Sequence, residues 1–182
     1  MKDKKVVLKL EDPKLFTTLY RRLRSFGVDV SYDSGSLVVS DSGEGDIPIS
    51  RTADPSETAV SIYLRLLNKE RFDELLIGID TNQDRLTLAV VADGQLLESE
   101  ELELEETPGY ITRVIERYPH RRVYIGVGVG NGGGRKAYEY LKKFFPHAKK
   151  VNESKTNYRT PYVSIKDKDL RAAYVIAIRS TT

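Results

Sequence analysis

The chain of 182 residues contains no cysteine, no tryptophan and only two histidines. Without cysteine, disulfide bonds, thiol catalysis and thiolate metal sites are excluded, and two histidines argue against a zinc site. No apolar run approaches the roughly 18 residues of a membrane span, and the apolar stretch after Lys5 is too short for a signal peptide. We therefore expect a cytoplasmic protein that has no membrane partner.

The net charge of +2 conceals a strong asymmetry along the chain. Residues 1–120 contain 15 Lys and Arg against 23 Asp and Glu, whereas residues 121–182 contain 14 against 4. A basic part of this kind supplies the sequence-independent attraction to phosphate that contributes to nucleic-acid binding. The alternative is a basic face that lies opposite an acidic partner domain.

Residues 1–72 are expected to form a small α/β domain, since 40% hydrophobic residues suffice for a core. Pro13 and Gly27 mark the start and end of one helix, and Asp54 caps a second helix that begins with Pro55. The expected elements are a strand over 6–10, a helix over 13–26, strands over 28–32 and 36–39, and a helix from 55 to about 70. The role of this domain stays open.

Residues 73–182 are expected to form a second α/β domain whose elements follow the order βββαβαβα. Asp93-Gly94, between two alternating apolar segments, is the strongest short hairpin signal in the chain. The expected strands cover 75–80, 85–92, 95–104, 122–127 and 148–152, and the expected helices cover 108–118, 135–145 and 167–179. Such an order predicts a mixed sheet in which the first and fourth strands are neighbours and the fifth lies beside the fourth.

A glycine-rich stretch from Gly128 to Gly133 matches the dinucleotide fingerprint G-x-G-x-x-G, and Glu153 follows at about the distance of a ribose-binding residue. A dinucleotide fold needs this fingerprint after its first parallel strand, with several βα units to follow. Only one strand and one helix follow here, so we interpret the glycines as structural. They permit a close approach of backbone, and Gly134 and its neighbours are expected to allow positive φ where the loop enters the helix.

Three carboxylates are predicted to converge at one end of the second sheet. Asp80 ends the first strand, Glu153 follows the fifth, and Asp169 lies in the first turn of the last helix. Hard oxygen ligands of this sort hold Mg²⁺ or Mn²⁺, and two such ions roughly 4 Å apart support phosphodiester hydrolysis. The alternative roles are structural: a hydrogen-bond acceptor at a strand end, an exposed loop residue and a charge that favours the helix macrodipole.

Four segments of the second domain resemble successive motifs of the RuvC/YqgF branch of the ribonuclease H-like superfamily, which includes Holliday junction resolvases. They are "IGIDTNQDRLTLAVVADGQLL", "RRVYIGVGVGNGGG", "KKVNESKTN" and "KDKDLRAAYVIAIR". The resemblance is closest to archaeal proteins of uncharacterised activity that carry such a C-terminal domain. It implies a ribonuclease H-like fold and a metal-dependent nuclease or resolvase, with Asp80, Glu153 and Asp169 as catalytic and metal-binding carboxylates and Asp167 as a further metal ligand. Asp167 is also a natural helix cap.

Basic residues surround these carboxylates in sequence, and we expect them to guide a nucleic-acid backbone, either a DNA junction or RNA. A solvated surface is the alternative for each. Arg135 and Lys136 follow the glycines at the start of a helix, where free backbone N–H groups also favour phosphate. The others are Lys155, Arg159, Lys166, Lys168 and Arg171.

A catalytically degenerate module is the competing hypothesis. Resolvases of the RuvC type add a carboxylate at the fourth strand, where this chain has glycines and Asn131, and the family has a glycine where this chain has Thr81 and Asn82. Such a module would bind nucleic acid or protein partners without cleaving them.

A sugar-kinase type of nucleotide site would need a second large domain, for which the first 70 residues are too few. Resemblance to resolvases also implies a homodimer.

Overall fold

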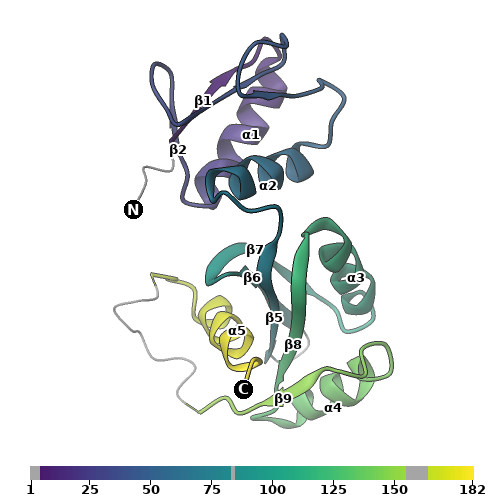
Figure 1. Cartoon of the computed structure of the whole chain (residues 1–182). Helices are drawn as coiled ribbons and strands as arrows, with labels where there is room; N and C mark the ends of the chain where they lie inside the picture. The colour runs from purple at the N-terminus through teal and green to yellow at the C-terminus, as the bar shows by residue number, and fades with distance from the viewer. Residues whose placement is uncertain (1–4, 83–84, 155–163) are drawn as a thin grey trace. The chain divides into compact units, whose positions relative to one another are not determined.

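The computed structural model describes residues 5–82, 85–154 and 164–182 (Figure 1). The chain divides into two compact units, Met1–Arg71 and Phe72–Thr182, next to the predicted division between residues 72 and 73. None of the helices in the described ranges has the length and apolar character that crossing a bilayer requires.

The first unit contains a four-stranded parallel sheet in the order β2-β1-β3-β4, together with two helices that pack against each other. Both helices begin as predicted, because the side chains of Asp12 and Asp54 accept hydrogen bonds from the first turns. The second helix ends earlier than predicted, and Asn68 follows it with a φ of 54°. The elements are β1 (Lys5–Lys9), α1 (Pro13–Ser25), β2 (Asp29–Ser31), β3 (Leu37–Ser40), β4 (Ile47–Pro48) and α2 (Pro55–Leu66).

The second unit contains a five-stranded mixed sheet in the order β7-β6-β5-β8-β9. β5 pairs antiparallel with β6 and parallel with β8, and β9 extends the parallel part. The predicted neighbours and the hairpin are confirmed, and Asp93 and Gly94 have the positive φ values, 48° and 83°, that a tight hairpin turn uses. The strands are β5 (Phe72–Asn82), β6 (Arg85–Ala92), β7 (Gln95–Leu102), β8 (His120–Gly128) and β9 (Lys149–Val151).

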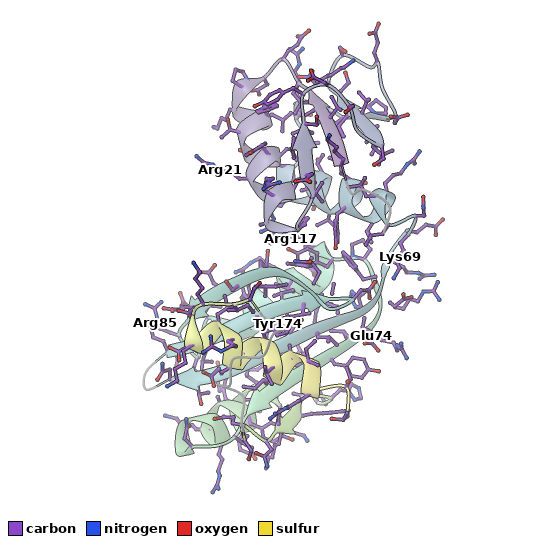
Figure 2. All side chains as sticks on the ribbon, turned by 90° about the vertical axis from the view of Figure 1, so that its left-hand side faces the viewer. Arg21, Lys69, Glu74, Arg85, Arg117 and Tyr174 are labelled. Atoms are coloured by element: carbon purple, nitrogen blue, oxygen red, sulfur yellow. The ribbon has the colours of Figure 1, made fainter. Side chains whose placement is uncertain are left out.

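Three helices cover the two faces of this sheet: α3 (Thr107–Arg117), α4 (Gly132–Leu141) and α5 (Lys168–Arg179). α3 and α4 lie on one face, and α5 lies on the other (Figure 1). Figure 2 shows α5 crossing its face of the sheet, where the Tyr174 hydroxyl donates to the carbonyl of Gly94 at 2.8 Å. The core beneath α5 consists of small and aliphatic side chains, Leu76, Ala89, Val91, Ala173 and Ala177.

Two glycines in neighbouring strands allow α5 to lie directly on the sheet. Gly78 and Gly126 are paired in register between β5 and β8. A Cβ atom on Gly78 would overlap the backbone of Ala173 and Ala177, and one on Gly126 would lie 2.8 Å from the Cβ of Ser180. Glycine within a strand often marks such a close approach. This packing fixes the start of α5 near the end of β5 that carries Asp80.

Candidate metal centre

Asp80 lies inside β5, one residue beyond the last pairing of this strand with β8. It still pairs with Thr87 on β6, so the antiparallel side of the strand holds its backbone in place. Only 8% of the residue is exposed, which is unusual for a carboxylate. The buried acidic side chain thus lies just beyond the point where the pairing between β5 and β8 ends.

Like charges and burial make ionisation of Asp80 costly. Burial is the largest cause of a rise in its pKa to about 6, and the negative charges of Glu153 and Asp169 add to that rise. The backbone N–H of Thr81 and the positive charge of Lys168 act in the opposite direction. The three predicted carboxylates are therefore close enough to interact, although β5, the segment after β9 and α5 are distant in sequence.

Glu153 occupies the space that two of the glycines leave free. Its Oε1 accepts a hydrogen bond from the N–H of Gly130 at 2.9 Å. A Cβ atom on Gly128 would collide with this carboxylate, and one on Gly130 would lie 2.5 Å from its Oε2. The expected close approach is confirmed, but what approaches these two glycines is chiefly a carboxylate. The expectation of positive φ around Gly134 is wrong, because the described glycines with positive φ are Gly27, Gly43, Gly45 and Gly94.

Asp169 and Asp167 have different partners at the start of α5. Asp169 Oδ2 accepts a hydrogen bond from Asn82 Nδ2 at 2.7 Å, which links the helix to the end of β5. Asp167 is the N-cap of α5 and accepts from the N–H of Leu170 at 2.7 Å. The structure thus gives Asp167 the capping role that was the alternative to a fourth metal ligand.

Asn131 fixes the loop between β8 and α4. Its Oδ1 accepts from the N–H of Gly134 at 2.8 Å and from the Thr81 hydroxyl at 3.2 Å, while its Nδ2 donates to the Thr81 carbonyl at 3.2 Å. This cap explains why α4 begins at Gly132 rather than at the predicted Arg135. A Cβ atom on Gly134 would overlap the carbonyl of Gly128, so the helix start depends on glycine. α4 also ends at Leu141, earlier than predicted.

The predicted phosphate-guiding residues separate into four groups. Lys168 lies at the start of α5, and its charge acts on Asp80. Arg135 and Lys136 are exposed on α4, whereas Lys155 and Arg159 lie outside the described residues. Arg171 is only 5% exposed and donates to the carbonyls of Ile165 and Lys166, so its guanidinium serves the chain's own backbone.

Arg179, which the sequence did not single out, holds the backbone on both sides of Glu153. One guanidinium nitrogen donates to the carbonyls of Asn152 and Ser154 at 2.8 and 2.7 Å. The Asn152 side chain accepts from the N–H of Ser154 at 2.8 Å, which tightens the same turn. A single arginine after the apolar segment from Val175 to Ile178, in the last turn of α5, was the available signal. Glu153 is thus fixed at its backbone by α5 and at its carboxylate by Gly130.

The chemistry of this cluster fits a divalent cation, because three carboxylates with hard oxygen ligands are close enough to repel one another and a positive ion would offset that repulsion. Asp80, Glu153 and Asp169 are the residues that would hold such an ion. Within the described residues, however, no three acidic or histidine side chains have the mutual geometry of a metal site. Glu153 and Asp169 instead accept hydrogen bonds from Gly130 and Asn82.

Comparisons with protein-family models, with curated proteins and with solved structures gave no match. Function is therefore inferred from the residues of this site and from the motif resemblance.

Proposed function

We propose that the chain is a divalent-metal-dependent nuclease of the ribonuclease H-like, RuvC/YqgF type that hydrolyses phosphodiesters in structured nucleic acid. The observation that carries this proposal is the buried Asp80, whose ionisation is opposed by Glu153 and Asp169. A fold gains nothing from gathering three carboxylates around a buried position unless a cation or a proton offsets them. Strongly perturbed carboxylates of this kind are concentrated at functional sites.

The sheet supports the ribonuclease H-like assignment. Three consecutive antiparallel strands are followed by two parallel strands that enter through helices, and the first strand lies at the centre of the order β7-β6-β5-β8-β9. This is the arrangement that the motif resemblance implies. Two-fold symmetry of a four-way junction adds the expectation of a homodimer.

Each carboxylate has a distinct part in the proposed reaction. Asp80 would bind the metal centrally, while Asn82 orients Asp169, and Gly130 and Arg179 orient Glu153. A bound Mg²⁺ or Mn²⁺ supplies a Lewis acid for the phosphate oxygens and lowers the pKa of the attacking water. In the hydrolysis, oxygen from water bonds to phosphorus, one P–O ester bond breaks, and the departing oxygen takes a proton. The products are a phosphate monoester and a free hydroxyl.

A catalytically degenerate module is the second candidate, and two observations favour it. The loop after β8 carries Asn131, which forms hydrogen bonds with Thr81 and Gly134, in place of a further carboxylate. The carboxylates also lack the mutual geometry of a preformed ion site in the described part of the chain. Such a module would bind nucleic acid or a protein partner and leave it intact.

Cleavage of labelled substrates separates the two candidates. The protein is incubated with a four-way DNA junction, duplex DNA and single-stranded RNA in Mg²⁺ or Mn²⁺. We expect cleavage by the wild type, loss of cleavage in Asp80→Asn, and unchanged cleavage in Glu116→Gln, which removes an exposed carboxylate from α3. Cleavage that survives Asp80→Asn contradicts the mechanism, and a wild type that cleaves none of the substrates favours the module.

A further inference from the structure

A groove of about 770 Å³ follows the outer edge of β9, between α4 and the end of α5. Four of the described residues that line it are cations, and none of the described lining residues is acidic. The lining also offers hydroxyl and amide groups as hydrogen-bond donors. The polar members are Lys142, Lys149, Lys150, Asn152, Ser154, Arg179 and Thr182.

The lysines reach the groove from both faces of this edge strand. Successive side chains of a strand point to opposite faces, and Lys150 lies over the Tyr138 ring of α4, with its Nζ 4.6 Å from the ring centroid. Lys142 approaches the same ring and donates to its hydroxyl at 2.6 Å. Lys149 instead lies over Tyr124 of β8, with its Nζ 5.5 Å from that ring centroid. The aromatic rings thus hold the cations in place along the edge.

Little negative charge opposes these cations within the same segment. Residues 132–152 contain six Lys and Arg and a single acidic residue, Glu139. That glutamate is exposed and forms an ion pair with Lys150 at 3.4 Å. Exposed pairs of this kind contribute little and exchange readily for another anion.

The groove leads to the candidate metal centre. Asn152 and Ser154 both line it, and Glu153 lies between them. Arg179 lines the groove and also binds the carbonyls on either side of Glu153. An extended ligand in the groove would therefore pass beside Glu153, one of the three carboxylates.

We infer that this groove binds the sugar-phosphate backbone of one nucleic-acid strand, next to the phosphodiester at the carboxylates. The inference rests on the proposed function for its position relative to a reacting phosphate. Several cations spread along a groove of this size match successive phosphates better than one small anion. Contacts with phosphate set the register of a strand without reading its sequence, so the groove places the strand and leaves base recognition to other residues.

The test removes two cations that lie on the α4 side. Lys142→Gln/Lys150→Gln is compared with Arg113→Gln/Arg121→Gln, which removes two cations from α3 and from the start of β8, at the opposite end of that strand from Gly128. All proteins carry Asp80→Asn to prevent cleavage. Fluorescence anisotropy measures affinity for a four-way junction, duplex DNA, single-stranded DNA and single-stranded RNA over a range of salt concentrations without divalent metal.

We expect the groove variant to bind more weakly regardless of sequence, while the control pair binds like its parent. The slope of log K against log salt should become shallower by about 1.8 on duplex or about 1.4 on a single strand, the loss of two phosphate contacts. The nucleic acid whose binding affinity falls most in the groove variant identifies the type of strand that the groove binds. Unchanged affinity and slope in the groove variant overturn the inference.

If the lysines serve only to prevent the edge strand from pairing with another chain, the experiment should give a different result. Lysine on an edge strand also discourages pairing with another chain, so new oligomers in size-exclusion chromatography with unchanged binding overturn the inference as well. The nuclease proposal is judged separately, by cleavage that depends on Asp80. If cleavage depends on Asp80 but the groove variant binds as well as its parent, only the groove inference is rejected. If the groove variant binds more weakly but the protein cleaves no substrate, only the nuclease proposal is rejected.

Discussion

At the scale of single residues, Asp80 destabilises the folded chain when it is ionised, and the same charge would allow it to bind a cation. The side chain is buried, and two other carboxylates act on it, so its pKa rises to about 6. Replacing this side chain by its neutral isostere would remove the cost and keep the shape. A residue that destabilises its own fold in this way is typical of a site that needs a ligand.

Asp80→Asn should therefore stabilise the protein at pH 8 in the presence of EDTA. Because the folded pKa of about 6 exceeds the unfolded value of 3.8, protonated Asp80 favours folding below pH 4, and this stability is lost as the pH rises through 6. The gain in the free energy of unfolding at pH 8 should be at most about 3 kcal/mol and should vanish near pH 4. Urea denaturation at both pH values measures it, and an equal gain at both would contradict the electrostatic cause.

Gly130 offers a way to move Glu153 without altering its chemistry. The three atoms nearest to an added Cβ at this position all belong to Glu153, and the closest is Oε2, at the end of a flexible side chain, at 2.5 Å. Gly130→Ala should thus change the free energy of unfolding by less than about 1 kcal/mol while weakening divalent-metal binding as much as Glu153→Gln does. Gly132→Ala is the matched control, since nothing lies within 4 Å of its added Cβ. Metal binding that is equal in the two alanine variants would show that the position of Glu153 is immaterial.

At the scale of elements, α5 connects the core to the site. Its small residues pack on the glycine pair of β5 and β8, its first turn carries Asp169, and its last turn carries Arg179. A shift of this helix would therefore displace two of the three carboxylates together. The close contact of Gly78 with the backbone of α5 is the place where a single substitution would most directly displace this helix.

Gly78→Ala should strongly destabilise the second unit. The added methyl group would overlap the backbone of Ala173 and Ala177, which has no flexible end to move aside. We expect a loss of about 3 kcal/mol or more in the free energy of unfolding. Gly109→Ala in α3 should instead be neutral or stabilising by up to about 1 kcal/mol, because its nearest neighbour is a flexible arginine end at 3.6 Å. Similar stability of both variants by urea denaturation would contradict direct packing of α5 on the sheet.

Local patterns predicted the order of the elements well, because alternation, helix caps and the Asp93-Gly94 turn are properties of neighbouring residues. The convergence of Asp80, Glu153 and Asp169 was predicted from the order of the strands in the sheet together with the positions of these residues in the sequence. Contacts between segments that are distant in sequence could not be predicted from local patterns. Nothing beside Gly130 in sequence indicates that Glu153 fills its space, and the helix start at Gly132 depends on the side chain of Asn131. Arg179 serves a turn far from it in sequence.

At the scale of the whole molecule, the charge asymmetry of the sequence takes a specific form within the second unit. β7 and β9 are the two edges of the same sheet. The strand and loop at the β7 edge carry six glutamates, whereas α4 and the segment through β9 are basic. The six are Glu98, Glu100, Glu101, Glu103, Glu105 and Glu106. A polyanion is therefore attracted to the β9 edge and repelled from the β7 edge, which orients it toward the candidate centre.

The most direct test of the account is calorimetric titration of Mn²⁺ into the wild-type chain, Asp80→Asn and Glu116→Gln at pH 7.5. The three carboxylates should give the wild type a saturable site that Glu116→Gln retains and Asp80→Asn loses. A wild type that binds no Mn²⁺, or an Asp80→Asn variant that binds it as tightly as the wild type, would contradict the claim that these carboxylates form a metal centre.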